Sequence, residues 1–124
     1  MKLYQFFDFQ SFYVENQNKK MPIKTAYKLA NFTEQAKKEI EFYQKTINQI
    51  LNECGQKDEN GNPIKGDAPG TVLLIKGKQK EAQDRIKELE ELDIEVKPIF
   101  TIDEIETFDI TLKQLENLKS LIIE

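Results

Sequence analysis

Apolar residues recur at alternating spacings of three and four along the segment that follows Pro22. The positions of this repeat are Ala26, Leu29, Thr33, Ala36, Ile40, Tyr43, Ile47 and Ile50. A repeat sustained over more than three heptads is typical of a helix that packs lengthwise against other helices. Proline suits the first turn of a helix, and Gly55 suits the cap that ends one. The sequence therefore predicts one continuous helix over residues 22–54.

The segment before this helix is rich in aromatic residues, which are Tyr4, Phe6, Phe7, Phe9, Phe12 and Tyr13. We expect residues 3–16 to form a short helix with a wide apolar face, and an N-terminal strand is the alternative. One helical stripe holds Leu3, Phe6, Phe7 and Val14, and the other aromatic residues fall beside it. These aromatic side chains are more than one side of one helix can bury. They are therefore interpreted either as core residues or as a surface for a partner.

Two segments of the chain have the patterns of short strands. Residues 71–75 form a β-branched apolar run, and residues 94–99 alternate between apolar and charged side chains. The pair Asn60-Gly61 favours a two-residue hairpin turn, in which both positions adopt positive φ. Residues 66–70 are expected to form a loop.

Two further amphipathic helices are predicted, over residues 78–92 and from about Thr111 onward, with an acidic turn at 101–108. One face of the last helix would carry Leu112, Leu115, Leu118 and Ile122. The predicted fold is α+β, with one long helix packed by shorter helices and a small, mostly antiparallel sheet. A chain of 124 residues is expected to form a single domain, residues 1–124.

The side-chain chemistry of the sequence argues against an enzyme. The chain has no His and a single Cys, Cys54, which removes the commonest general base and any Cys-rich metal site. Residues 58–69 begin like a calcium loop, but Pro63 and Pro69 stand where that loop needs Gly and Glu. The run at 70–78 has the wrong spacing for a phosphate-binding loop. We therefore expect no catalytic residues, no metal and no cofactor.

The charge of the chain disfavours nucleic acid as a partner. The formal net charge is −4, and an acidic surface repels phosphate backbones. No apolar run approaches the roughly 20 residues that a membrane span needs. No small-residue cleavage site follows the N-terminal apolar residues, so these are not expected to be a secretory signal. The sequence predicts a cytoplasmic protein that binds neither nucleic acid nor membranes.

Two groups of residues are candidates for binding a partner protein. The candidate residues are Tyr4, Phe9, Tyr13, Asp103, Glu104 and Glu106. The three aromatic residues would anchor the partner, because buried aromatic side chains dominate many interfaces. The three acids would steer a basic partner, and their alternative interpretation is a solvated face. The partner would be a host or phage protein, or a second copy of the chain in a two-fold dimer.

Three stretches of the sequence support a family resemblance. They are MPIKTAYKL at 21–29, GQKDENGNP at 55–63 and LKSLIIE at 118–124. With these stretches, the chain resembles a family of small, functionally uncharacterised proteins of phages and prophages of Gram-positive bacteria. The resemblance covers nearly the whole chain. It implies a phage origin and a non-enzymatic accessory role, in the cytoplasm of an infected bacterial host.

Two functions are compatible with such an accessory role. The first is binding to another protein, with inhibition of a host defence component as the expected outcome. The second is a structural role as a virion or tail-assembly accessory protein. Both expectations are based on the small size, the acidity and the lack of catalytic groups. The fold by itself does not define a function.

Overall fold

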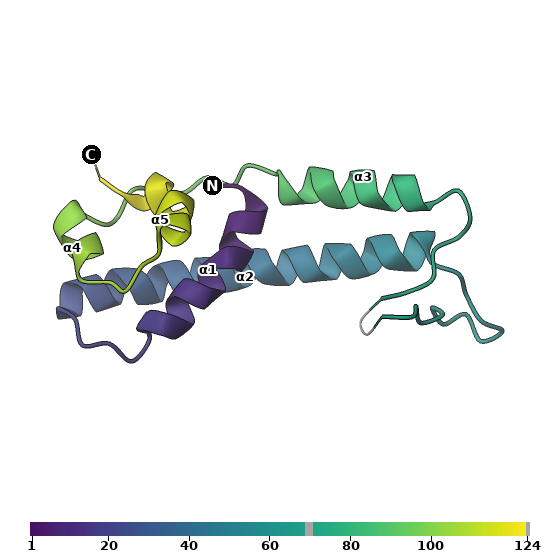
Figure 1. Ribbon diagram of the computed structural model, residues 1–124, viewed down its shortest axis with the longest axis horizontal. Coiled ribbons are helices and arrows are strands. Elements are labelled where there is room, and N and C mark those ends of the chain that lie inside the picture. Colours follow the sequence, from purple (N-terminus) through teal and green to yellow (C-terminus); the bar gives the residue numbers. More distant parts are fainter. Residues whose placement is uncertain (69–70, 124) are drawn as a thin grey trace. The chain divides into compact units, whose positions relative to one another are not determined.

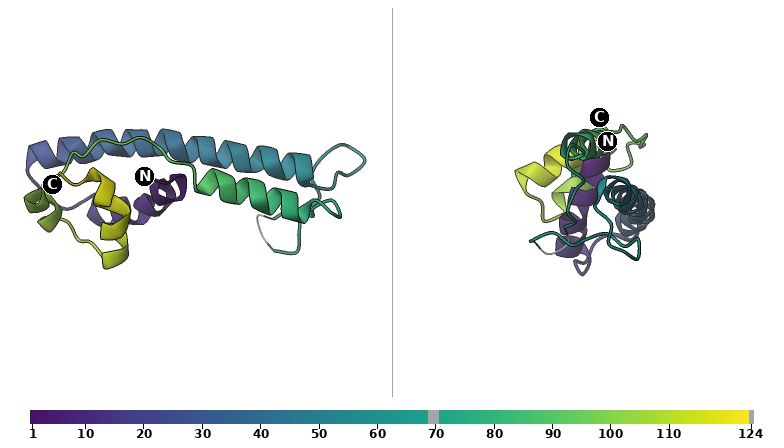
Figure 2. Two further views of the ribbon diagram at one scale, coloured as in Figure 1. Left: turned by 90° about the horizontal axis from the view of Figure 1, so that it is seen from above. Right: turned by 90° about the vertical axis from the view of Figure 1, so that its right-hand side faces the viewer.

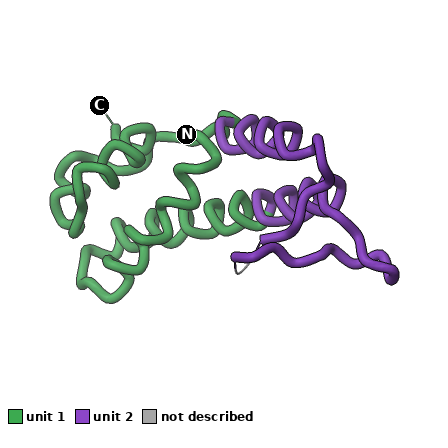
Figure 3. Tube along the Cα trace, turned by 45° about the vertical axis from the view of Figure 1, so that its right-hand side comes forward, with its two compact units in different colours: residues 1–41, 92–124 green, residues 42–91 purple. Residues whose placement is uncertain are grey.

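The structure is a computed structural model that describes residues 1–68 and 71–123, and Figure 1 labels its helices. The helices are α1 (Leu3–Asn16), α2 (Ile23–Cys54), α3 (Gln79–Glu90), α4 (Ile102–Glu106), α5 (Leu112–Leu118) and the 3₁₀ helix η1 (Lys119–Leu121). The chain forms two compact units, which Figure 3 colours separately. Unit 1 comprises residues 1–41 and 92–124, and unit 2 comprises residues 42–91, so α2 contributes to both. A single domain over residues 1–124 stays a prediction.

The predicted α+β fold is wrong, because the chain is mostly helical. Helices make up 60% of it, and pairing between extended segments of the described residues is limited to isolated bridges without a sheet. In the predicted strand at 71–75, Val72 bridges Lys65 whereas Leu74 bridges Gly55. Because these neighbouring bridges lead to different segments, neither extends into the ladder of repeated pairs that makes a strand.

The second predicted strand, at 94–99, lacks a β partner along most of its length. In the described chain, bridges hold it only at its flanks, at Asp93 and at Phe100. Its alternating pattern does appear in the burial, because Ile94 and Val96 are half-buried and the residue between them is exposed. Figure 2 shows this segment following the first half of α2 within unit 1. The alternation thus reports which side chains face inward, and it does not require a sheet.

The helix predicted over residues 22–54 is confirmed, since α2 runs without a break from Ile23 to Cys54. The strict seven-residue seam is wrong in places, because Ala26 is exposed and Ile47 is only half-buried. A straight α-helix drifts by about 20° per heptad relative to a strict seven-residue repeat, so one seam cannot face one core throughout. The buried face of the first part of α2 carries Thr25, Leu29, Phe32, Thr33, Ala36 and Ile40.

The helix predicted over residues 3–16 is also confirmed, but α1 buries a different face from the predicted one. Its buried residues are Leu3, Phe6, Phe9, Phe12 and Asn16. Phe7 and Val14, which were expected on the inward stripe, are exposed.

Ring contacts explain which face of α1 is buried. The Phe9 ring centroid lies 4.9 Å from that of Phe32 on α2, edge to face. Phe12 meets Phe108 in the same way at 5.2 Å, and Phe108 meets Phe100 at 5.4 Å. Each such pair adds about 0.5–1.5 kcal/mol beyond the area that it buries. The buried face is therefore the one that reaches both α2 and the C-terminal segment.

Capping boxes begin the two short C-terminal helices of unit 1, at Thr101 for α4 and at Thr111 for α5. The predicted apolar face of the last helix is only partly right, because Leu118 is buried but Leu112 is exposed. Gln114 is buried instead, since its side chain completes the cap and also reaches the Ser11 and Glu15 side chains of α1. The inward face of α5 therefore includes a polar residue that lies outside the predicted apolar face.

Unit 2 pairs the second part of α2 with α3, which confirms the helix predicted at 78–92 with slightly shorter ends. Its core contains Ile50, Cys54 and Ala82, with Leu74 and Ile86 packed against them. The Tyr43 hydroxyl donates to the Glu90 carboxylate across 2.9 Å. Burial raises the pKa of Tyr43 to about 12, and this hydrogen bond adds to the effect. The predicted loop at 66–70 includes residues 69 and 70, which lie outside the described part.

The turn predicted at Asn60-Gly61 is present, with a backbone that differs from the predicted one. Gly61 has φ of +79°, whereas no non-glycine residue of the described chain has positive φ. Asn60 therefore does not adopt the conformation expected of a two-residue hairpin turn. The Asp58 carboxylate stabilises the turn instead, because its Oδ1 accepts the backbone N–H groups of Asn60 and Asn62, each at 2.9 Å.

Candidate partner-binding groove

A small apolar groove lies between α1 and the first half of α2, entirely within unit 1. Its volume is about 140 Å³. α1 lines it with Phe9, Gln10, Tyr13 and Val14, and α2 lines it with Thr33, Ala36, Lys37 and Ile40. Sites for small molecules usually enclose roughly 300–1,000 Å³. This groove is therefore better matched to a single apolar side chain of another protein.

Small side chains on α2 create the groove. The Ala36 side chain is a single methyl group. The Thr33 hydroxyl donates to the Leu29 carbonyl of the same helix at 2.7 Å. The Phe9 ring is held by its edge-to-face contact with Phe32. Because Thr33 and Ala36 are small, a depression remains beside them between the two helices. Lys37 is the single charged residue of its lining.

The structure brings two of the three predicted aromatic anchors together. Phe9 is 2% exposed and forms a wall of the groove, and half-buried Tyr13 lies beside it with ring centroids 6.4 Å apart. Tyr4 is 41% exposed, but it precedes Tyr13 by nine residues. Nine residues correspond to about two and a half helical turns, so Tyr4 points to the opposite side of α1.

Six groove residues were not among the predicted site residues: Gln10, Val14, Thr33, Ala36, Lys37 and Ile40. A signal for the groove does exist in the sequence, because the first half of the predicted seam carries small residues such as Thr33 and Ala36. Small residues on a helix allow close approach of a neighbouring helix or leave space where the approach is incomplete. Which of the two occurs depends on how α1 crosses α2.

A second hollow of unit 1 is larger but less suited to an apolar anchor. It measures about 420 Å³ and lies between α2 and the extended segment 95–99. Its lining includes the polar side chains of Asn31, Gln35, Glu95 and Lys97. Gln35 also crosses this hollow, because its Nε2 donates to the Glu95 carbonyl at 3.4 Å.

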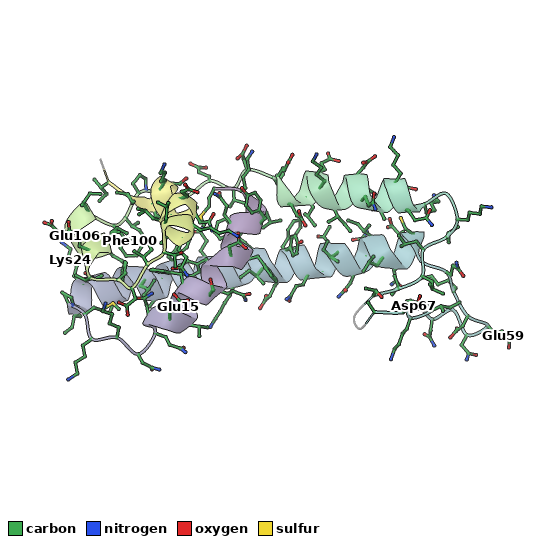
Figure 4. The ribbon with its side chains drawn as sticks, viewed as in Figure 1. Glu15, Lys24, Glu59, Asp67, Phe100 and Glu106 are labelled. Atoms are coloured by element: carbon green, nitrogen blue, oxygen red, sulfur yellow. The ribbon has the colours of Figure 1, made fainter. Side chains whose placement is uncertain are left out.

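The three predicted acidic residues all belong to α4, but they do different things. Asp103 and Glu106 are exposed, and Figure 4 shows Glu106 where α4 meets the start of α2, near Lys24. The Glu104 side chain is only 14% exposed. Its carboxylate accepts from Lys28 Nζ at 2.7 Å and from Thr25 Oγ1 at 2.8 Å, both on α2.

Glu104 therefore ties α4 to α2 instead of facing a partner. The same carboxylate accepts the Thr101 backbone N–H at 3.0 Å, which completes the capping box of α4. The hydrogen bond from Lys28, helped by those from Thr101 and Thr25, lowers the pKa of Glu104 to about 2. Lys28 and Ala36 are eight residues apart, which corresponds to about 12 Å along α2 between this tie and the groove.

The Glu104 tie predicts a specific loss of stability in acid. A carboxyl group whose pKa is lowered on folding contributes stability above its unfolded value of 4.5, and loses it as the pH falls toward about 2. At neutral pH we expect Glu104→Gln to lower the free energy of unfolding by about 2 kcal/mol, less than the full shift because solvent screens part of the interaction. Urea unfolding at a series of pH values should show this difference disappearing near pH 2.

The matched control for this prediction is Asp103→Asn, which removes an exposed carboxylate from the same short helix. We expect it to change the free energy of unfolding by less than about 0.5 kcal/mol at neutral pH. A wild-type curve that parallels the Glu104→Gln curve throughout the acid range would contradict the tie.

The described residues, 1–68 and 71–123, contain no group of three Cys, Asp or Glu side chains arranged to hold a metal ion. None of the helices in this part of the chain is both long enough and apolar enough to cross a membrane. The resemblance to phage and prophage proteins stays a prediction. No protein-family model, curated protein or solved structure matches this chain.

Proposed function

We propose that this chain is a non-enzymatic accessory protein of a phage or prophage that binds another protein through the α1–α2 groove. The observation that supports this proposal is the groove itself, an apolar depression of about 140 Å³ on the surface of unit 1. An interface of this kind places one apolar side chain of the partner in the pocket and surrounds it with neutral contacts. Inhibition of a host defence component is the function that we propose for this binding.

The edge of the groove has the side chains that such an interface uses. Val14 is 61% exposed at one edge, and half-buried Tyr13 presents an aromatic ring that packs against the Phe9 ring. Side chains held in place before binding lose less conformational entropy when the partner arrives. We propose Tyr13 and Val14 as the anchors, in place of the three aromatic residues predicted from the sequence.

Exposed acids would act on the rate of binding more than on its strength. Asp103 and Glu106 are exposed on α4, and the formal net charge of the chain is −4. Charges outside the buried centre of an interface mainly steer association. We propose that the partner carries a basic surface next to its apolar side chain. Charge-reversing substitutions at Asp103 and Glu106 should then slow association, with little effect on dissociation.

The test compares two single substitutions at exposed apolar positions of unit 1. Val14→Glu places a charge at the groove, and Leu112→Glu places the same charge on α5, where Leu112 is 74% exposed. Both should leave the fold intact, since neither side chain is buried. Tagged proteins are used to capture partners from a lysate of a Gram-positive host and from phage-infected cells, and each partner is then purified for binding measurements.

We expect Val14→Glu to weaken binding of the captured partner at least about tenfold, and Leu112→Glu to leave it unchanged. A partner that is a virion or tail component would favour the structural role over the anti-defence role. A partner that binds both variants as well as the wild type would contradict the groove as the binding site. Sedimentation velocity of the same three proteins tests the two-fold homodimer, because Val14→Glu should abolish a dimer formed through the groove.

A further inference from the structure

We propose that Asn60 is a modification site at which the chain deamidates spontaneously, through attack of the Gly61 backbone nitrogen on the Asn60 side-chain amide. The turn between Asp58 and Asn62 in unit 2 presents this pair to solvent, since both residues are exposed. Figure 4 shows Glu59, the residue before Asn60, at the outer tip of this loop. The modification replaces a neutral amide by a carboxylate in a turn that already carries acidic residues.

The structure leaves the reacting groups accessible. The Asn60 side-chain amide makes no hydrogen bond to any described residue, so it can rotate toward the following nitrogen. Gly61 has no side chain, and a Cβ built on it would meet nothing within 4 Å. The Gly61 N–H donates to the Asp58 carbonyl at 3.0 Å, a bond that lies in an exposed turn. Exposed turns open locally at little cost in free energy.

The reaction balances with water as its only co-reactant. A base removes the proton from the Gly61 nitrogen, and this nitrogen forms a bond to Cγ of Asn60. The bond from Cγ to Nδ2 then breaks and ammonia leaves with a proton from solvent, so that a five-membered succinimide ring remains. Water opens the ring at either carbonyl, which produces aspartate or isoaspartate at position 60.

Other asparagines of the chain provide controls within the same molecule. Asn62 is followed by Pro63, which has no N–H to supply the nucleophile. Asn48 lies within α2, where the following backbone N–H is held by the helix. Asn16 is fully buried, and its Nδ2 donates to two backbone carbonyls. We expect these three residues to remain unmodified while Asn60 converts.

Conversion would alter the turn and leave the helices unchanged. Isoaspartate adds a methylene group to the backbone between the two N–H groups that Asp58 Oδ1 accepts, those of Asn60 and Asn62. The added methylene group changes the spacing of these two N–H groups, so we expect the Asp58 carboxylate to lose one of the two hydrogen bonds. The new negative charge at position 60 also lies within two residues of Asp58 and Glu59, and neighbouring like charges repel. The bridge between Lys57 and Pro63 should therefore weaken, so the tip of unit 2 would differ between newly made and aged protein.

The experiment incubates the full chain at mildly alkaline pH and follows each asparagine by peptide mass spectrometry. We expect a gain of about 1 Da at Asn60 alone, which is the replacement of an amide by an acid group. Labelling by an isoaspartyl methyltransferase should identify the isoaspartate fraction. Gly61→Ala should slow the reaction at least about tenfold, because a side chain then shields the nitrogen and restricts its backbone.

The same incubation in concentrated urea determines whether the fold protects the site. We expect the rate at Asn60 in the folded protein to lie within about tenfold of its rate in urea, as suits an exposed turn. An Asn60 that converts in urea but stays intact in the folded protein would overturn the proposal. Equal conversion at Asn60 and Asn62 would also overturn it, because position 62 cannot use the same nucleophile.

Discussion

Replacing Phe9 by alanine is expected to lower the free energy of unfolding by about 3–5 kcal/mol, as for other buried phenylalanines. The Phe9 ring is in contact with the rings of Phe12, Tyr13 and Phe32, with centroids 4.9–6.4 Å away. Its removal leaves a cavity between α1 and α2. The neighbouring rings cannot fill this cavity without giving up their own partners. Urea unfolding followed by circular dichroism measures the loss.

The control for this substitution is Tyr4→Ala, on the same helix but on its exposed side. We expect it to lower the free energy of unfolding by less than about 1 kcal/mol. Equal losses for the two variants would mean that α1 buries a different face. Because Phe9 is both a core residue and a wall of the groove, its substitution cannot separate folding from binding. Val14, which is exposed, serves that purpose.

Replacing Asn16 by alanine is expected to lower the free energy of unfolding by about 2–4 kcal/mol. The Asn16 side chain is buried at the end of α1, and its amide forms hydrogen bonds with both backbone polar groups of Asp109. Its Nδ2 donates to the Asp109 carbonyl and its Oδ1 accepts the Asp109 N–H, each at 2.8 Å. Without the amide, both backbone groups lose their partner in a partly buried site. This cost adds to that of the cavity.

Asn18→Ala is the matched control, because Asn18 is exposed two residues further along. It should change the free energy of unfolding by less than about 0.5 kcal/mol. Asn16→Asp keeps the acceptor oxygen but loses the donor, so we expect a loss of stability of at least about 1 kcal/mol from the unpaired Asp109 carbonyl. If Asn16→Ala is as stable as wild type, the amide does not hold the C-terminal segment on α1.

Helix positions were the part of the fold that sequence patterns could predict. Residues 3–16, 22–54 and 78–92 carry helical periodicity over ten residues or more, and each corresponds to a helix of the structure. Periodicity of this kind depends on neighbours three and four residues away, so it is encoded locally. The capping boxes at Thr101 and Thr111 follow the same local logic and were readable as Thr followed three residues later by Glu or Gln.

The candidate site was predictable only in outline. Aromatic content drew attention to α1, and small residues marked the first half of α2, but neither pattern showed that Tyr13 and Val14 border one groove. Glu104 looked like its acidic neighbours in the sequence. Its role as a tie depends on Lys28 and Thr25, which are more than 70 residues away in the chain. Contacts of such sequence separation leave no local pattern.

The sequence by itself determined where the three longest helices lie and where the chain turns at Asn60-Gly61. It also determined that the chain has no His. The tertiary structure alone decided which face of each helix is buried and whether extended segments become strands. A strand exists only when a partner segment supplies repeated backbone hydrogen bonds. Residues 71–75 have the composition of a strand, but their bridges lead to two different segments. The physical reason for this difference is that helical hydrogen bonds join residues four apart in the chain. β pairing and side-chain packing instead require partners that are distant in the chain and that only the complete fold brings close.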